Sequence, residues 1–502
     1  MAAHAEPVAA PAAPVLRSDA AALLAVAGLT VAAFLLRLRG MDQSLFGDEL
    51  FTYAVASQPS LGDVVAALQR TENNPPLFYA LAWAASQLGD PAVWMRLPSL
   101  IAGTAVVPVM YLLGRRTVGR TAALLATAFI AISPFAIFYS NEGRAYATLI
   151  FFVTLSTLVL LVALERGAWR WWIAYGVCVA LVLYTHYTGL FPLGAQALWA
   201  LWTHRERLRE LLLVHLAAGI AYVPWLPYYS DQNQFFGFEK LGAPLSLDAV
   251  FRGALAALYG HPYIALQRFP GDVALVLAGV ATVLAVGGAT VLVMRGRTNA
   301  APDRRWLLLG LLAASTPLAL VLYSLLGPDI WGARNLSASL PAVMLLVAGL
   351  LVSIPRPASV AATALILVGL VLGTAKVMDA DYDRPPLKQA AARVDARAQP
   401  GDAVIDILFQ SDYGPLGKGL ALNFDRPRKL YAPGVDDDEA WRRAAQGAHV
   451  FLIVPQVGPL VGSRPRSGPA PGYPLQSARV YPGFLPIGVF EYGNDAERSG
   501  QP

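Results

Sequence analysis

The stretch from Ala20 to Leu36 reads AAALLAVAGLTVAAFLL and contains no charged residue. Arg37 and Arg39 follow it, whereas a cleaved signal peptide has a basic start and small residues at its cleavage site. We therefore predict an uncleaved first membrane span. Residues 1–19, rich in Ala and Pro, are predicted to be a disordered cytoplasmic tail.

Similar apolar runs recur along most of the first 375 of the 502 residues. Hydrophobic residues make up 56% of the chain and charged residues 14%, against roughly 25% charged in a soluble domain. This composition excludes a soluble enzyme, a disordered protein and a singly anchored ectodomain. The further spans are predicted at 97–114, 121–139, 146–164, 171–185, 187–202, 211–229, 273–294, 306–326, 336–353 and 358–375. A tight turn at Thr185-His186-Tyr187 separates the fifth and sixth of the eleven spans.

Basic residues predict the orientation. The connecting segments 115–120, 165–170, 203–210, 295–305 and 354–357 hold 13 Lys and Arg in 35 residues. The alternate segments 37–96, 140–145, 186–188, 229–270 and 327–335 hold 9 in 120 residues. Because positive loops stay in the cytoplasm, the second set is predicted to lie outside. The N-terminus is then cytoplasmic, and the C-terminus is extracytoplasmic in a multi-pass plasma (inner) membrane protein.

One apolar stretch is too short to be a span. Pro75 to Leu88 falls below the roughly 20 residues needed to cross a bilayer, and counting it would invert every later basic loop. We interpret it as a juxtamembrane or re-entrant helix on the outer face. It lies in the first outer loop, residues 37–96, of a transmembrane domain at 20–375.

The composition changes after Lys376. Residues 376–502 are predicted to form a small extracytoplasmic α/β domain. Its expected elements are a helix at Leu387–Ala398, strands at Ala403–Phe409 and Val450–Val454, and a Pro/Gly-rich loop at Gln456–Pro474. The single cysteine, Cys178, cannot form an intrachain disulfide. The net charge of +5 arises from clusters that orient membrane helices, so no nucleic-acid partner is predicted.

The first outer loop carries two adjacent acids, Asp48 and Glu49, in the string LFGDELFTY at 45–53. In such an apolar setting, desolvation disfavours ionisation unless a cation or a donor compensates. A helix N-terminus, which favours acids, is an equally good explanation of the bare motif. Three further strings stand at the same outer level, namely NNPPLFY at 73–79, RLPS at 96–99 and SNEGRAY at 140–146.

Five arginines violate the positive-inside tendency beside these acids. Arginine is suited to holding phosphate through paired hydrogen bonds, although arginines also extend towards lipid headgroups. Snorkelling explains one or two of the five more easily than all of them. The candidates for binding a donor phosphate are Arg37, Arg39, Arg96, Arg144 and Arg334.

In their order and spacing these strings resemble the GT-C glycosyltransferases. More narrowly, they are similar to glycosyltransferase family 39 and its bacterial relatives, which include protein O-mannosyltransferases and aminoarabinose transferases acting on lipid A. The resemblance is good from about Phe34 to Phe191, including YTHY at 184–187, and thins to Arg334-Asn335-Leu336 ahead of Pro341. The C-terminal domain carries no motif of the family.

The resemblance implies a GT-C transmembrane domain, a polyprenyl-phosphate-linked sugar as donor and an acceptor that approaches from outside. Asp48 matches the catalytic Asp of the family, and Glu49 matches its neighbour, which helps to shape the site. One departure is Asn74, where many relatives have His or Lys before the two prolines. The residues expected to line the site are Tyr53, Asn74, Pro75, Pro76, Tyr79, Glu142, Tyr146, His186 and Tyr187.

We hypothesise a single displacement that inverts the anomeric carbon and transfers a hexose or a pentose. Asp48 would activate the acceptor, and Arg96, Arg144 and Arg334 would hold the departing phosphate. The acceptor could be a protein, a glycolipid or a glycan. No His cluster has the spacing of metal ligands, so no cofactor is predicted, with a divalent metal left as an open alternative. His186 is interpreted as a hydrogen-bonded lining residue.

Two rival functions remain. A lipid or sugar transporter or flippase would place ionisable residues near the middle of the spans and show paired repeats. In this sequence the middle of the predicted spans is nearly free of charge, and no internal repeat is evident. A non-catalytic sugar-lipid receptor would keep the arginines without needing Asp48. An apolar string at Phe235–Phe238, in the loop Ser230–Pro270, is a candidate cover for the site, and a surface-lying segment explains it equally well.

Overall fold

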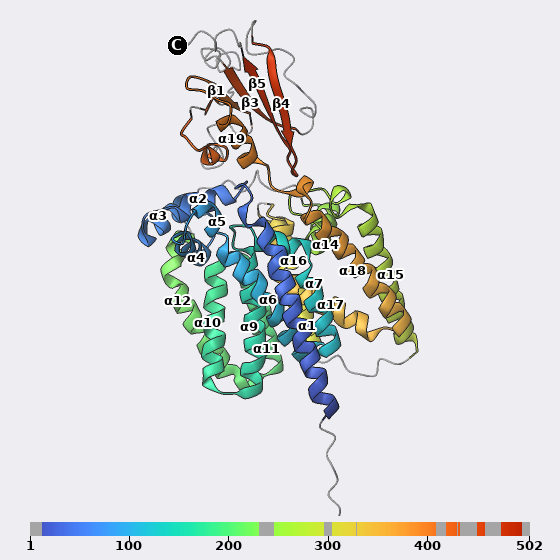
Figure 1. The fold of residues 1–502 in the computed structure, drawn as a ribbon. Coiled ribbons are helices and arrows are strands. Elements are labelled where there is room, and N and C mark those ends of the chain that lie inside the picture. Colours follow the sequence, from blue (N-terminus) through green and yellow to red (C-terminus); the bar gives the residue numbers. More distant parts are fainter. Residues whose placement is uncertain are drawn as a thin grey trace, which may run out of the picture.

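Eleven helical segments of the computed structural model stand side by side and form the body of the protein (Figure 1). The structure describes residues 13–229, 245–295, 304–327, 329–407, 418–428, 430–431, 449–456 and 473–493. The bundle helices are α1 (Ala13–Leu38), α6 (Leu97–Thr117), α7 (Arg120–Ala131) with α8 (Pro134–Ser140), α9 (Tyr146–Arg166), α10 (Trp169–Thr185), α11 (Leu190–Thr203), α12 (Leu208–Tyr222), α15 (Asp272–Met294), α16 (Arg304–Leu326), α17 (Leu340–Ser353) and α18 (Arg356–Val377). Helix α1 thus begins inside the segment predicted as a tail.

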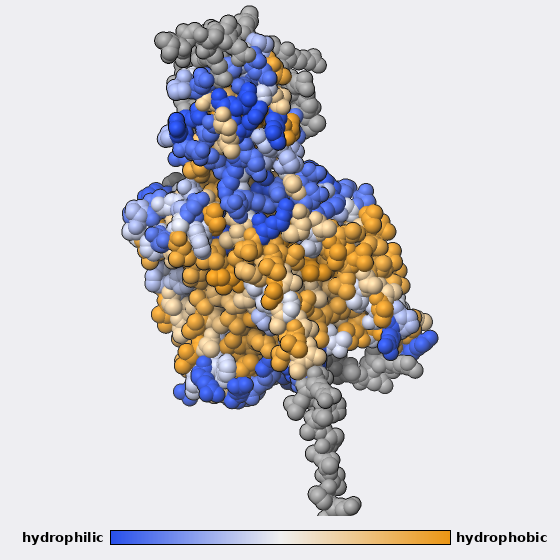
Figure 2. Space-filling model, in the orientation of Figure 1, coloured by the Kyte–Doolittle hydropathy of each residue, from blue (hydrophilic) through white to orange (hydrophobic). Residues whose placement is uncertain are grey.

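The outer surface of this bundle is apolar. Figure 2 shows a hydrophobic band across the visible face of the bundle, with hydrophilic residues at both ends of the bundle and over the C-terminal domain. On α12, for example, Leu212, Leu216 and Ile220 are all more than half exposed. A water-facing surface does not carry such a band, so the chain is a multi-pass membrane protein.

Eight described helices are long and apolar enough to cross a membrane, and the α7–α8 pair, bent by 57°, makes a ninth. The other two predicted spans, α10 and α11, have 17 and 14 residues. Both still connect the two ends of the bundle. At one end their junction brings His186 within 5.4 Å of the Tyr146 ring, at the start of α9. At the other end Arg304, at the start of α16, donates to the carbonyl of Thr203 at 3.1 Å.

The span predicted at 121–139 is broken rather than straight. Pro134 has no N–H to donate to the carbonyl of Ile130, and Ser133 caps the new helix by accepting from the N–H of Ala136. The side chain of Arg37 donates to the carbonyls of Ile130 at 3.0 Å and Ala131 at 2.9 Å. Fully buried Arg37 therefore satisfies the backbone that the break exposes.

Four short helices of the first outer loop lie at the end of the bundle that carries the C-terminal domain (Figure 1). They are α2 (Glu49–Ala56), α3 (Leu61–Thr71), α4 (Leu77–Ser86) and α5 (Pro91–Trp94). Helix α4 is the apolar stretch interpreted as juxtamembrane, and its 10 residues pack against α2, α3 and α5. A further helix, α14 (Leu247–Tyr259), lies at the same end, and the string at Phe235–Phe238 falls outside the described residues.

The C-terminal domain is a small α/β domain, as predicted. The described residues of this domain form five strands, β1 (Ala403–Asp406), β2 (Leu430–Tyr431), β3 (His449–Pro455), β4 (Leu475–Tyr481) and β5 (Ile487–Gly493), in the order β2-β1-β3-β5-β4. β1 is parallel to β2 and β3, whereas β5 is antiparallel to β3 and β4. Helix α19 (Leu387–Asp395) packs its apolar side against this sheet. Strands β2, β4 and β5 were not predicted from the sequence. Most of the predicted loop at Gln456–Pro474 lies outside the described residues.

Short 3-10 and π turns connect these elements. They are η1 (Arg39–Asp42), η2 (Tyr187–Gly189), η3 (Arg205–Arg207), η4 (Val223–Trp225), η6 (Gln267–Gly271), η7 (Ala333–Ser339), η8 (Ala380–Tyr382) and η10 (Ala421–Asn423).

The role of Arg37 gives a first prediction. Arg37→Met keeps the volume but leaves the carbonyls of Ile130 and Ala131 buried without donors, at about 1–3 kcal/mol for each carbonyl. We expect a clearly lower thermal unfolding temperature in detergent, whereas Arg209→Met, at an exposed position of α12, should leave it unchanged. Equal unfolding temperatures for the Arg37 variant and the unmodified protein would contradict this assignment.

Candidate active site

The site forms where the first outer loop meets five later segments of the chain, at residues 142–144, 186, 263, 334 and 384. Gly47 adopts a φ of 57°, a left-handed conformation that suits glycine, and the chain turns there into α2. Asp48 is the N-cap residue of α2, and Glu49 is its first residue. The turn therefore sends these two adjacent side chains into different environments, Glu49 inwards and Asp48 towards the surface.

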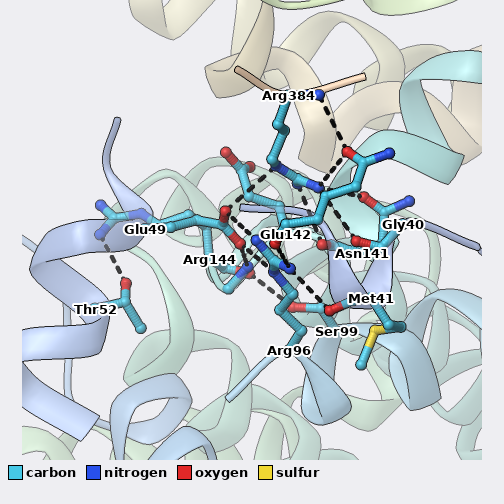
Figure 3. A network of polar contacts seen from close by, with 12 residues as sticks. Gly40, Met41, Glu49, Thr52, Arg96, Ser99, Asn141, Glu142, Arg144 and Arg384 are labelled. Atoms are coloured by element: carbon cyan, nitrogen blue, oxygen red, sulfur yellow. Dashed lines mark hydrogen bonds and ion pairs between the residues drawn. The ribbon is translucent and has the colours of Figure 1, made fainter. Parts of the chain in front are cut away.

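Glu49 is completely buried and is held by charge-assisted hydrogen bonds (Figure 3). The guanidinium of Arg96 donates to both of its oxygens at 2.7 Å, and the N–H of Gly143 donates to Oε1 at 2.7 Å. Arg384 forms a second ion pair with Oε2 at 3.3 Å. Burial by itself raises the pKa of Glu49, but these two arginines outweigh it and hold that pKa below its ordinary value. Glu49 is thus an ionised structural anchor.

Asp48 lies at the surface of the same cluster. Its side chain is 35% exposed, and its Oδ2 accepts a hydrogen bond of 2.6 Å from Arg334 of η7, whose side chain is 42% exposed. The backbone carbonyl of Asp48 accepts from Arg144 at 3.3 Å. An exposed pair of this kind adds about 0–1 kcal/mol of stability, so a ligand can replace either partner at little cost.

Arg144, in the turn between α8 and α9, contacts residues of the first outer loop on α2, α4 and the segment after α3. It forms a paired ion contact with the buried carboxylate of Glu72, and its Nη1 also contacts the hydroxyl of Thr52 at 3.2 Å. Its guanidinium lies 6.0 Å from the centre of the Tyr79 ring. Burial alone lowers the pKa of Arg144, but the Glu72 carboxylate raises it well above the ordinary value. Arg144 therefore remains a permanent positive charge beside Asp48.

Glu142 is a second buried carboxyl group, with an environment opposite to that of Glu49. It is 2% exposed, its Oε1 accepts from the hydroxyl of Tyr263 at 3.5 Å, and its Oε2 has no hydrogen-bond partner among the described residues. Burial, assisted by the charge of Glu49, raises the pKa of Glu142 to about 8. At neutral pH it is therefore mainly a neutral acid that can donate a hydrogen bond.

His186 lines the inner side of the cluster. Its Nδ1 accepts from the N–H of Thr188 at 3.2 Å, and its ring lies 5.4 Å from that of Tyr146. Burial, with the charges of Arg144 and Arg334, lowers the pKa of His186 to about 3. The imidazole is therefore neutral and hydrogen-bonded. Within the described part of the chain, no group of three or more His, Cys, Asp or Glu side chains is placed to hold a metal ion.

The five predicted phosphate ligands separate into two groups. Arg37 and Arg96 are fully buried and donate to protein oxygens. Arg39 forms an ion pair at 3.0 Å with Asp383. Arg144 and Arg334 are the two that the structure places directly at Asp48.

The other predicted lining residues lie around the first outer loop. Pro75 and Pro76 precede α4, and the amide of Asn74 donates to the hydroxyl of buried Tyr79 at 3.5 Å. Tyr53 packs among the apolar side chains between α2 and α4. Tyr187 packs against the hydrophobic cluster that contains Tyr79, and its hydroxyl accepts from Trp225 of η4 at 3.1 Å.

Three residues of the site were missed in the sequence analysis. Glu72 directly precedes the Asn-Asn-Pro-Pro string, and an unpaired Arg144 could have prompted a search for such an acid. Tyr263 and Arg384 come from segments without a recognisable motif, more than 100 residues from Glu142 in sequence. Only the folded chain places them at the site.

An apolar helical bundle with a polar site at one end, below a small α/β domain, defines a multi-pass membrane protein whose site opens towards one membrane face. The sequence model of the family described as dolichyl-phosphate-mannose-protein mannosyltransferase matches residues 73–230. A putative mannosyltransferase of Bacillus subtilis, YkcB, is 32% identical over 105 residues, which are 21% of this chain and 15% of that relative. The match thus spans less than a sixth of the length of the relative.

The fold is shared with a solved structure. ArnT from Cupriavidus metallidurans bound to undecaprenyl phosphate has a TM-score of 0.56 at 14% identity, covering 93% of this chain and 97% of that chain. The apo state of ArnT gives the same TM-score and identity, with 94% and 98% coverage. These comparisons confirm the predicted resemblance, and the chain has the fold of ArnT.

The buried acid Glu142 gives the second prediction. Its folded-state pKa of about 8 lies above the value of about 4.3 for an unfolded Glu. The resulting stabilisation is complete below about pH 4 and is lost as the pH rises through about 8. Glu142→Gln mimics the protonated acid and does not titrate. We expect its unfolding temperature, relative to the unmodified protein, to rise steadily from pH 5 to pH 8 and then level off.

Measuring both proteins in the same buffers cancels the titration of all other groups. A difference in unfolding temperature that stays constant between pH 5 and pH 8 would show that Glu142 is already ionised in the folded protein.

Proposed function

We propose that this protein is a membrane glycosyltransferase that moves a sugar from a polyprenyl-phosphate carrier to an acceptor at the membrane face bearing the C-terminal domain. The observation that carries the proposal is the partly exposed Asp48, with Arg334 at 2.6 Å and Arg144 at its carbonyl. A partly exposed carboxylate can remove a proton from an acceptor. The neighbouring positive charges of partly exposed Arg334 and buried Arg144 suit the release of a phosphate. The undecaprenyl phosphate bound to ArnT, which has the same fold, supports a lipid-linked donor.

In the proposed reaction, Asp48 accepts the proton of an acceptor hydroxyl or amine as that atom attacks the anomeric carbon. The bond between this carbon and the phosphate oxygen breaks on the opposite face, so the configuration inverts. The polyprenyl phosphate leaves with the bonding electron pair, and no general acid is needed because phosphate is a stable leaving group. Asp48 then releases its proton to solvent.

Arg334 has two possible partners in this scheme. Without substrate it pairs with Asp48, and with a donor bound it can turn to the phosphate, which frees the carboxylate to act as a base. Arg144 is held by Glu72 and adds a fixed positive charge near the leaving group. In this scheme Arg334 is the movable arginine and Arg144 is the fixed one. The hypothesis needs no metal ion or other cofactor.

The distribution of charge supports an enzyme over a transporter. In the described part of the chain the acids of the site, Asp48, Glu49, Glu72 and Glu142, all lie at the end of the bundle next to the C-terminal domain. A transport pathway calls for ionisable groups near mid-depth. The basic loops further predict that this end faces outwards from a plasma (inner) membrane, with the N-terminus in the cytoplasm.

The third prediction tests this function. Membranes containing the protein are incubated with a panel of polyprenyl-phosphate sugars, hexoses and pentoses, each labelled in the sugar. We expect one label to leave the lipid, and Asp48→Asn to reduce that transfer by roughly 10²–10⁴-fold, the usual effect of removing a general base. Asp248→Asn, at a 68% exposed side chain of α14, is the matched control and should keep full activity.

Each contrary outcome has a distinct meaning. Transfer by Asp48→Asn at the unmodified rate would remove Asp48 from the mechanism. Label that crosses the membrane still attached to its lipid would identify a flippase. Saturable binding of a donor without any turnover would identify a receptor.

A further inference from the structure

Arg384 is the most deeply buried charged residue that the C-terminal segment contributes to the site. It lies in the link between η8 and α19, and only 4% of its surface is exposed. Besides its ion pair with Glu49 at 3.3 Å, its Nη2 donates to the carbonyl of Asn141 and its Nη1 to Oδ1 of Asn141, both at 3.2 Å. Its guanidinium also lies 4.9 Å from the centre of the Phe138 ring.

Arg384 therefore bridges two segments that are far apart in the sequence. One is the first outer loop, through Glu49, and the other is the turn after α8, through Asn141. Figure 3 shows Arg384 reaching across from the chain above into the cluster of Glu49, Glu142 and Asn141. Since Glu49 is bonded to Asp48 through the backbone, the position of Asp48 depends on this bridge.

The neighbouring residues hold the link in place. Asp383 forms an ion pair with Arg39 at 3.0 Å and accepts from Gln43 at 2.6 Å. Lys388 pairs with Asp42 at 2.6 Å, and its N–H donates to the hydroxyl of Ser44 at 3.0 Å. All of these partners lie between the end of α1 and Asp48. The C-terminal segment is thus attached to the short stretch that carries the acids.

An aromatic contact attaches the domain at a second place. Phe484, in the turn between β4 and β5, stacks on Tyr263 with ring centres 5.9 Å apart and an interplanar angle of 10°. It also meets Phe46, two residues before Asp48, edge to face at 5.3 Å. Tyr263 in turn donates to Glu142. Two independent parts of the C-terminal segment therefore touch the surroundings of Asp48.

We propose that Arg384 is a positioning residue of the catalytic site, so that the C-terminal segment completes the active site instead of forming a separate module. Arg384 sets the geometry of Asp48 by fixing Glu49 against the turn at Asn141. This inference rests on the proposed function, because it assigns Arg384 to the same transfer reaction.

The charges around Glu49 make the effect of Arg384 specific. The groups that face Glu49 are Arg96 before α6, Arg384 in the link, the N–H of Gly143, and the neighbouring carboxyls Glu142 and Asp48. Burial raises the pKa of Glu49, and the two arginines and the N–H of Gly143 lower it. When Arg384 is removed, only Arg96 and this N–H oppose the effect of burial, so the pKa of Glu49 rises. Protonated Glu49 binds Arg96 and Gly143 weakly, and the site loosens at low pH but not at high pH.

The experiment measures kcat and KM for transfer from pH 5 to pH 9 in the full-length protein. For Arg384→Met we expect kcat to fall at least about threefold at pH 5 and to recover towards alkaline pH. The acid limb should move upwards by about one pH unit or more, as expected when an opposite charge is removed from a carboxylate. Arg384→Lys keeps the charge but loses the paired bonds to Asn141, so it should lower kcat with KM for the donor and the acid limb unchanged.

Arg428→Met is the matched control, because Arg428 forms an ion pair at 2.8 Å with Asp395 inside the C-terminal domain, away from the site. Its pH profile should equal that of the unmodified protein. A reduction of kcat by one constant factor at every pH in Arg384→Met would mean a merely structural role and overturn the proposal. If this variant does not accumulate in membranes, an unchanged kcat in Arg384→Lys would overturn it equally.

These outcomes separate the inference from the proposed function. An unmodified protein that transfers no sugar would contradict the function itself. An active protein whose Arg384→Met variant has the unmodified pH profile would contradict only the role of Arg384.

Discussion

The site depends on one buried charge, the carboxylate of Glu49. Three segments far apart in the sequence meet on it, through Arg96, the N–H of Gly143 and Arg384. A fully buried carboxylate is unfavourable by several kcal/mol unless every one of its hydrogen-bond and ion-pair partners is in place. Displacing any one of the three segments therefore destabilises the contacts of the other two with Glu49. This constraint places Asp48, the next residue along the chain, at a defined point of the surface.

The two adjacent acids consequently have different roles, although they look equivalent in the sequence. Glu49 is saturated by protein donors and has no free position for a substrate, whereas Asp48 shares only an exposed contact with Arg334. The same contrast separates Glu49 from Glu142, which is equally buried but lacks a direct cationic partner, so its pKa moves in the opposite direction. The environment of each carboxyl, rather than its type, decides its chemistry.

Much of the architecture could be predicted, because the length of an apolar run and the basic residues beside it can be read from a short stretch of sequence. The spans, the short helix α4 and the α/β nature of the C-terminal domain follow from such patterns. The role of Arg37 could not, because it depends on carbonyls that Pro134 leaves without donors elsewhere in the bundle. The ion pairs of Glu72 with Arg144 and of Arg384 with Glu49 join residues far apart in the sequence, so only the folded chain shows them. Strand β4 has mostly exposed side chains and therefore lacks the apolar pattern by which a strand is predicted.

The most direct test of this division of roles is the thermal unfolding of Glu49→Gln and Asp48→Asn, measured side by side in detergent. Glu49→Gln leaves Arg96 and Arg384 buried without their carboxylate, which predicts a loss of about 3–5 kcal/mol and a much lower unfolding temperature. Asp48→Asn removes an exposed contact and should unfold close to the unmodified protein, with a change of about 0–1 kcal/mol. Equal shifts in the two variants, or a larger shift in Asp48→Asn, would contradict the account.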